Sequence, residues 1–315
     1  MAENIEFREL AQELTRLYNT GDYAAALKAV EQKVDSFPEE RARTTFWQLC
    51  LLSLLGRPDE VMSLFRHGLN TGLWWADQTF IDPDLNAVRD LTEFKRLVEE
   101  SHKKYLEARL HIQPDRAVLV PDETGKELPL LIALHGRNGE KETNLEHWDV
   151  ARQRGWLVLS PQSTQPLYNG SYCWDNPVQG IKDILLHVDE MMRAYKVDRQ
   201  RVLFGGFSQG SGMAIYAALS GAIPARGFIG IGTFWRDPPE LDALAKQASN
   251  LRGYFITGEK DQMLDRVREI QNILRANNIQ FAEEVHADIG HEFSTDFKTS
   301  FDHAIEFIFN ALDGA

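Results

Sequence analysis

A serine set between glycines is the residue of this sequence with the clearest capacity for chemistry. The segment Gly206-Phe207-Ser208-Gln209-Gly210 follows the apolar run Val202–Phe204 and precedes a helical pattern over residues 209–220. On such a strand-to-helix turn the hydroxyl stands clear of the sheet, and the helix N-terminus directs N–H groups toward a developing oxyanion. We predict that Ser208 is a nucleophile; the alternative is a glycine-rich turn with an incidental serine.

A nucleophilic serine on this kind of turn needs an acid and then a histidine, in that chain order. Asp261 follows the apolar run Gly253–Thr257, at the end of an expected strand, where sites in open α/β sheets lie. We prefer Asp261 to the competitors Glu259 and Asp265 as the acid. An aspartate at this position is also a common helix N-cap, and both roles are compatible.

The expected base is a histidine in a loop near the C-terminus. His291 follows Gly290 and lies between the apolar run Phe281–Val285 and the last helical pattern. His286, at the end of a strand, and His303, in a helix, are the alternatives, and their positions favour packing or surface roles. The predicted triad is therefore Ser208, Asp261 and His291, with the imidazole taking the serine proton while the carboxylate fixes its tautomer.

Two backbone N–H groups are expected to form an oxyanion hole. One belongs to Gln209, directly after the nucleophile, and the other to Arg137, in the loop that follows the apolar run Leu130–Leu134. Trp174 lies in a loop before a long helical pattern, where it either walls the acyl pocket or packs beneath its loop.

The elements that must position these residues follow from the pattern of the chain beyond residue 116. Short apolar runs alternate with amphipathic stretches, which is typical of βαβ units and a mostly parallel sheet with helices on both faces. The expected strands are Ala117–Val120, Leu130–Leu134, Trp156–Leu159, Val202–Phe204, Gly227–Ile231, Gly253–Thr257 and Phe281–Val285. The expected helices span residues 143–154, 177–195, 209–220, 238–248, 262–277 and 296–312.

The first part of the chain shows helical periodicity almost throughout. Segments that begin at Gly21 and Gly56 are alike and resemble the helix-turn-helix unit of tetratricopeptide repeats. We predict a small all-helical domain over residues 1–108 and a catalytic domain over residues 109–315. Trp74 and Trp75 interrupt the pattern; if helical, they point about 100° apart, so one is expected on a contact surface unless both pack inside.

Composition limits the classes of partner. The chain has 315 residues and a net charge of −13, which disfavours binding to nucleic acid. The N-terminus shows no secretory pattern and no apolar run is long enough to span a bilayer. Cys50 and Cys173 form neither a disulfide framework nor a metal pattern, so we expect a cytoplasmic protein without metal or cofactor.

Several short motifs together resemble the phospholipase/carboxylesterase family, whose members include acyl-protein thioesterases. They are Leu134-His135-Gly136, Ser160-Pro161-Gln162, Trp174-Asp175, the pentapeptide around Ser208, Gly258 with Asp261, and Gly290-His291. The resemblance covers residues 115–315 and implies an α/β-hydrolase fold, hydrolysis of carboxylic esters or thioesters, no metal, and a Ser–Asp–His triad.

The loop after His135-Gly136 departs from the family pattern because it is polar, with Arg137 and Asn138. We therefore expect a serine carboxylesterase that hydrolyses small esters of short- to medium-chain acids. The alternatives are an acyl-protein thioesterase, a peptidase or a dienelactone-hydrolase-like enzyme. A different class is an interaction protein whose helical repeats bind a protein partner or a second copy of the chain.

Overall fold

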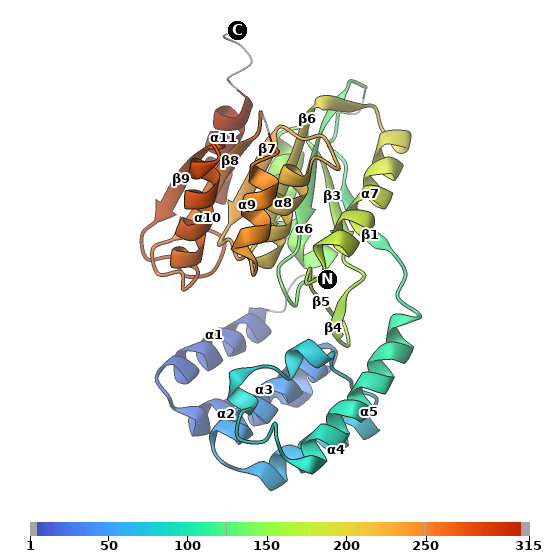
Figure 1. The fold of residues 1–315 in the computed structure, drawn as a ribbon, viewed down its shortest axis with the longest axis vertical. Coiled ribbons are helices and arrows are strands. Elements are labelled where there is room, and N and C mark those ends of the chain that lie inside the picture. Colours follow the sequence, from blue (N-terminus) through green and yellow to red (C-terminus); the bar gives the residue numbers. More distant parts are fainter. Residues whose placement is uncertain (1–4, 124, 249, 310–315) are drawn as a thin grey trace. The chain divides into compact units, whose positions relative to one another are not determined.

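The computed structural model describes residues 5–123, 125–248 and 250–309, and the chain divides into two compact units (Figure 1). The first unit runs to Gln113 and includes Pro166–Tyr172; the second contains Pro114–Gln165 and the chain from Cys173 onward. The first unit contains α1 (Ile5–Asn19), α2 (Tyr23–Lys33), α3 (Arg41–Leu54), α4 (Pro58–Asn70) and α5 (Thr92–Arg109), the 3-10 turns η1 (Val34–Ser36), η2 (Pro38–Glu40), η3 (Asp77–Thr79) and η4 (Pro83–Leu85), and the strands β4 (Pro166–Tyr168) and β5 (Ser171–Tyr172).

The second unit is built on a seven-stranded sheet with the order β1-β3-β2-β6-β7-β8-β9. The first strand pairs antiparallel with β3, and every other neighbouring pair in the sheet is parallel. Its strands are β1 (Asp115–Leu119), β2 (Leu128–Leu134), β3 (Leu157–Gln162), β6 (Val197–Phe207), β7 (Gly227–Ile231), β8 (Arg252–Gly258) and β9 (Gln280–His286). Its helices are α6 (Lys141–Gln153), α7 (Pro177–Ala194), α8 (Gln209–Ser220), α9 (Pro238–Ala245), α10 (Leu264–Ala276) and α11 (Phe297–Phe309).

Helices cover both faces of the sheet, which explains why its central strands are continuous apolar runs. In β2, Leu130 and Ile132 face one hydrophobic core, which also contains side chains of α7, α8, α9 and α10. Leu131 and Ala133 face the other core, against α6 and α11. The predicted mostly parallel α/β fold with a helical region before it is confirmed.

The helical region contains the turns expected from its glycines. Gly21 lies between α1 and α2 with φ of 75°, and Gly56 lies between α3 and α4 with φ of 68°. A positive φ strains residues with a side chain, so glycine suits both turns. The resemblance to tetratricopeptide repeats stays a prediction.

A hairpin from the middle of the chain belongs to the helical unit. The N–H of Ala76 donates to the carbonyl of Leu167 at 2.7 Å, and that of Trp74 donates to Oδ1 of Asn169 at 3.0 Å. Trp75 forms a bridge with Tyr168. The sequence predicted a boundary between residues 108 and 109. It did not predict this hairpin, because strands of two or three residues are too short to show a period.

Both adjacent tryptophans pack inside, which is the second of the two alternatives left open by the sequence. Trp74 is 8% exposed and Trp75 is fully buried. They lie on an extended segment, where neighbouring side chains point to opposite sides, and both sides are covered. Trp74 packs against Tyr105, while Trp75 packs against Phe65 and donates its indole N–H to the carbonyl of Ala42 at 3.0 Å.

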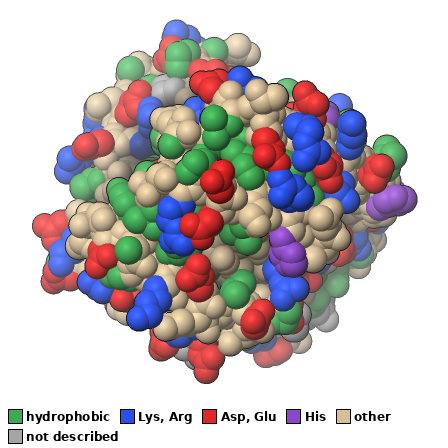
Figure 2. All heavy atoms as spheres, turned by 90° about the horizontal axis from the view of Figure 1, so that it is seen from below, with side chains coloured by type: hydrophobic (Ala, Val, Ile, Leu, Met, Phe, Trp, Pro, Cys, Tyr) green, Lys and Arg blue, Asp and Glu red, His purple; other side chains and the backbone are tan. Residues whose placement is uncertain are grey.

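The surface carries charges of both signs. On the face drawn in Figure 2, acidic and basic side chains are intermingled, so the acidic excess is spread out there. Among the described residues, no helix has both the length and the hydropathy needed to cross a bilayer.

Replacing Trp75 should destabilise the helical unit strongly. Trp75→Ala removes a buried ring and leaves a cavity, which costs about 3–5 kcal/mol in the free energy of unfolding. Urea unfolding followed by circular dichroism measures the loss. Ile81→Ala is the control, because Ile81 is 71% exposed and should change the free energy by less than about 0.5 kcal/mol. Equal effects of the two substitutions would contradict the burial of Trp75.

Candidate functional site

Ser208 lies on a strained turn between β6 and α8. Its φ of 54° and ψ of −120° are unusual for a residue with a side chain. Backbone bonds hold it there: its N–H donates to the carbonyl of Ile231 at 2.8 Å, and its carbonyl accepts from the N–H of Phe234 at 3.2 Å. Such strain persists only where the surroundings enforce it, and it is frequent at active sites.

The glycines beside Ser208 are required by close backbone approach. A Cβ atom at Gly206 would overlap the backbone of Gly210, and one at Gly210 would overlap the carbonyls of Leu134 and His135. The turn therefore packs directly against the end of β2.

The structure brings Ser208, His291 and Asp261 together at the carboxyl ends of β6, β9 and β8. The Oγ of Ser208 is 2.9 Å from Nε2 of His291. Nδ1 of that ring is 2.9 Å and 3.0 Å from the two carboxylate oxygens of Asp261. With a proton on Nδ1 donated to the carboxylate, Nε2 is free to accept the serine proton.

Asp261 is 5% exposed and also accepts the N–H of Met263 at 2.7 Å. That bond helps to hold the carboxylate at the start of the segment leading into α10. The competitors Glu259 and Asp265 are exposed side chains. Glu259 contacts the neighbouring strand through its backbone, donating its N–H to the carbonyl of His286.

The alternative histidines lie with Glu284. Nε2 of His286 is 3.2 Å from that carboxylate and 3.1 Å from Oγ of Ser300. Nδ1 of His303 is 2.6 Å from the same carboxylate. This pairing raises the pKa of His303, chiefly through its hydrogen bond to Glu284.

The loop after β2 contains a buried, neutral histidine. His135 is 1% exposed, and burial lowers its pKa to about 4. Its Nδ1–H donates to the carbonyl of Gly136 at 2.9 Å. Its Nε2 accepts from the N–H of Ser163 at 3.3 Å and from the amide of Gln162 at 3.1 Å. The ring therefore ties the start of this loop to the loop after β3.

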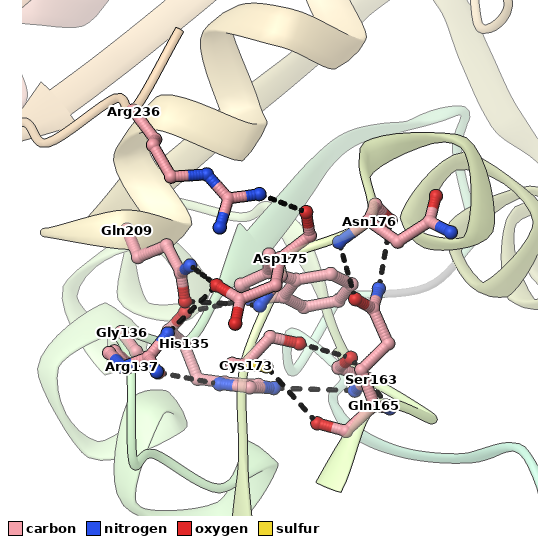
Figure 3. A network of polar contacts seen from close by, with 11 residues as sticks. His135, Gly136, Arg137, Ser163, Gln165, Cys173, Asp175, Asn176, Gln209 and Arg236 are labelled. Carbon is pink, nitrogen blue, oxygen red and sulfur yellow. Dashed lines mark hydrogen bonds and ion pairs between the residues drawn. The ribbon is translucent and has the colours of Figure 1, made fainter. Parts of the chain in front are cut away.

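The two predicted oxyanion donors are the backbone N–H groups of Gln209 and Arg137. Gln209 is the first residue of α8, so its N–H has no acceptor within the helix. Arg137 follows Gly136 in a turn closed by a hydrogen bond from the N–H of Gly139 to the carbonyl of Gly136. The side chains of Arg137 and Gln209 both reach the carboxylate of Asp175 (Figure 3).

Asp175 was not among the predicted site residues. The rule that singled out Asp261, a polar residue in a loop at the carboxyl edge of the sheet, also applies to Asp175 after β3. The intervening hairpin obscured this, because it separates Asp175 from the end of its strand.

Trp174 fits both interpretations made from the sequence. Its ring is 1% exposed, and its indole N–H donates to the carbonyl of His135 at 2.9 Å. It also borders a cavity of about 90 Å³, whose lining includes Asp175, Gln209, Phe234, Trp235 and Glu240. Burial raises the pKa of Glu240, and the negative charge of the nearby Asp237 raises it further.

A group of potential metal ligands lies in the helical unit. The ligand atoms of Cys50, Asp82 and Asp84 are within 4.8 Å of one another. Burial and the two carboxylates raise the pKa of the Cys50 thiol, so it stays protonated, and Asp84 already accepts the hydroxyl of Tyr18 at 2.8 Å. The buried thiol and the hydroxyl bound to Asp84 are consistent with a structural role for this group.

Both parts of the chain match known families. Residues 176–310 match the phospholipase/carboxylesterase family, and residues 6–109 match a domain described as the N-terminal domain of A/B hydrolase-like proteins. The chain is also similar to a bifunctional acetylxylan esterase/xylanase of Neocallimastix patriciarum, with 33% identity over 112 residues. That match covers 34% of this chain but only 16% of the relative.

Solved structures share the fold. An uncharacterized protein of Bacillus cereus has a TM-score of 0.55 and 22% identity, with 99% of this chain and 100% of that chain covered. Esterase PE8 has a TM-score of 0.52 and 18% identity, with 63% and 100% covered. A ferulic acid esterase has a TM-score of 0.51 and 15% identity, with 64% and 94% covered.

Burial of His135 should make stability depend on pH in a defined range. Its pKa is 6.5 when unfolded and about 4 when folded, so its contribution is complete above pH 6.5 and is lost as the pH falls toward 4. From pH 7 to pH 4.5 the loss is about 2–3 kcal/mol.

Urea unfolding at both pH values measures this loss in the wild type and in His135→Gln. Glutamine does not titrate, so the variant should lose about 2–3 kcal/mol less than the wild type between the two pH values. Identical losses in the two proteins would show that His135 is not buried as a neutral ring.

Proposed function

We propose that this chain, whose residues 176–310 match the phospholipase/carboxylesterase family, hydrolyses carboxylic esters with Ser208 as the nucleophile. The observation that carries the proposal is the hydrogen-bonded series Ser208–His291–Asp261 at the carboxyl edge of a parallel sheet. The serine hydroxyl contacts the histidine that would act as its base, and that histidine contacts the aspartate that would orient it.

The reaction has two halves. Nε2 of His291 takes the proton as Oγ of Ser208 bonds to the ester carbonyl carbon, and the same proton then goes to the leaving alcohol. Water, deprotonated by His291, attacks the acyl-enzyme and releases the acid and the free serine. In each half the N–H groups of Gln209 and Arg137 stabilise the negative oxygen.

A short acyl group suits the cavity that borders Gln209, the residue after the nucleophile. The cavity of about 90 Å³ is too small to enclose a long acyl chain. Phe234, which borders it, donates its N–H to the carbonyl of Ser208. The polar Arg137 at the neighbouring loop adds to the case for small esters.

A second candidate substrate is an acetylated carbohydrate. The relative named as an acetylxylan esterase/xylanase favours it, and an acetyl group fits a cavity of this size. A cytoplasmic location, and a partner or second copy bound by the helical unit, stay predictions.

Replacement of the nucleophile should abolish hydrolysis. Ser208→Ala is expected to lower kcat on an aryl acetate by about 10⁶-fold, because it removes the atom that forms the acyl-enzyme. His291→Ala should be nearly as severe and Asp261→Asn less so, since more catalysis survives loss of the acid. Steady-state kinetics measures all three.

The matched controls are the alternatives for acid and base. Glu259→Gln and His286→Ala should keep kcat within about threefold, because each lies outside the series and mutations there leave transition-state contacts unchanged. Retention of a tenth of the activity by Ser208→Ala would refute the nucleophile assignment. Collapse of Glu259→Gln with a normal Asp261→Asn would reassign the acid.

Acyl length should limit the rate. Across aryl esters from acetate to palmitate, kcat/KM is expected to be highest for acetyl to butanoyl and to fall by at least about tenfold by octanoyl, since each ill-fitting methylene costs about 1–3 kcal/mol. A thioester with the best acyl group, run in parallel, tests the thioesterase alternative. A steady rise of kcat/KM out to palmitate would contradict the small pocket.

A further inference from the structure

The side chains of both proposed oxyanion donors meet at one atom. Nη1 of Arg137 donates to Oδ1 of Asp175 at 2.8 Å, and Nε2 of Gln209 donates to the same oxygen at 2.7 Å (Figure 3). The Asp175 side chain is only 19% exposed, so these charge-assisted bonds are partly shielded from water.

The neighbouring Trp174 completes the connection. Its backbone N–H donates to Oε1 of Gln209 at 3.0 Å, so Trp174 and Asp175 hold both ends of that amide. Its indole N–H donates to the carbonyl of His135, two residues before Arg137. One dipeptide therefore contacts both segments that supply the oxyanion donors.

Hydrogen bonds within the second unit hold the dipeptide Trp174-Asp175 in place. Before it, the N–H of Cys173 donates to the carbonyl of Gln165 at 2.9 Å; after it, Asn176 and Gln165 exchange two hydrogen bonds. Arg236 donates to the carbonyl of Asp175 at 3.1 Å. The carboxylate is thus a fixed point against which Arg137 and Gln209 can be held.

We propose that Asp175 is a positioning residue that sets the spacing between the oxyanion N–H groups of Arg137 and Gln209. The inference rests on the proposed function. Asp175 acts through the two side chains it holds, while the donors to the oxyanion are backbone groups. Loss of one such donor costs about 10²–10³-fold in kcat, so loss of its alignment should cost part of that.

The first test is kinetic. Asp175→Ala is expected to lower kcat on an aryl acetate by about 10- to 100-fold and to change KM by less than about threefold, because the oxyanion forms only in the transition state. Binding of a small boronic acid, which forms a tetrahedral adduct on the serine, should weaken by a similar factor. Asp175→Asn, which keeps an oxygen acceptor, should retain most of the activity.

The second test is a mutant cycle. Arg137→Ala and Gln209→Ala keep their backbone N–H groups and remove only the side chains that Asp175 holds. If Asp175 acts through them, the triple variant should be no slower than Asp175→Ala alone, since losses through one network do not add.

The matched control is Asp302→Ala. Asp302 on α11 also holds an arginine, Arg154, through two hydrogen bonds of 2.8 Å and 2.6 Å. Its removal deletes a similar ion pair and should leave kcat and boronic acid binding unchanged. Circular dichroism verifies that each variant is folded. If Asp175→Ala fails to fold, Asp175→Asn and the Arg137→Ala/Gln209→Ala double variant are measured in its place. The double variant is expected to lose at least about fivefold in kcat.

Two results would overturn the proposal. The first is wild-type kcat and wild-type boronic acid affinity in folded Asp175→Ala, or in the double variant measured in its place. The second is a change in the variant's KM alone, which indicates that Asp175 contacts the substrate. In either case Ser208→Ala remains inactive, and the proposed function stands. Activity that survives Ser208→Ala defeats the proposed function and the inference with it.

Discussion

The backbone of Ser208 is held at a positive φ, and much of the surrounding structure follows from that constraint. A strand and a helix can join at so sharp a turn only where neighbouring segments come close, so Gly206 and Gly210 cannot carry side chains. The strain is offset by backbone bonds to Ile231 and Phe234, which tie the turn to the neighbouring strand β7 and to its following loop. The same turn orients the hydroxyl toward His291 and leaves the N–H of Gln209 at an open helix end.

Two side chains at the site, one buried histidine and one partly buried carboxylate, have opposite kinds of partner. His135 is buried without a carboxylate partner, and its low pKa keeps the ring an acceptor for the N–H of Ser163. Asp175, by contrast, faces an arginine and an amide donor. A protonated His135 would lose that acceptor, and the hydrogen bond from Ser163 with it.

The sequence was most informative where chemistry and periodicity coincide. Long apolar runs such as Leu130–Leu134 predicted strands because burial on both faces leaves a continuous apolar segment, and the turn around Ser208 has a compositional signature. Pro166–Tyr172 could not be found because its strands are too short for a period, and its partners lie far away in the chain. The sequence could not decide between burial and exposure for Trp74 and Trp75, because the helical geometry considered for them does not apply to an extended segment. Asp175 was missed because the hairpin Pro166–Tyr172 separates it from the end of β3.

The hairpin Pro166–Tyr172 also bears on the order in which the protein can fold during synthesis. Domains generally fold from the N-terminus as the chain emerges from the ribosome. Here the helical unit lacks the partners of Trp74 and Ala76 until the chain has been extended through β1, β2 and β3. Its last backbone hydrogen bonds therefore form only after β1, β2 and β3 have been synthesised. Because Pro166–Tyr172 lies within the sequence of the second unit, a single cut in the chain cannot separate the two units.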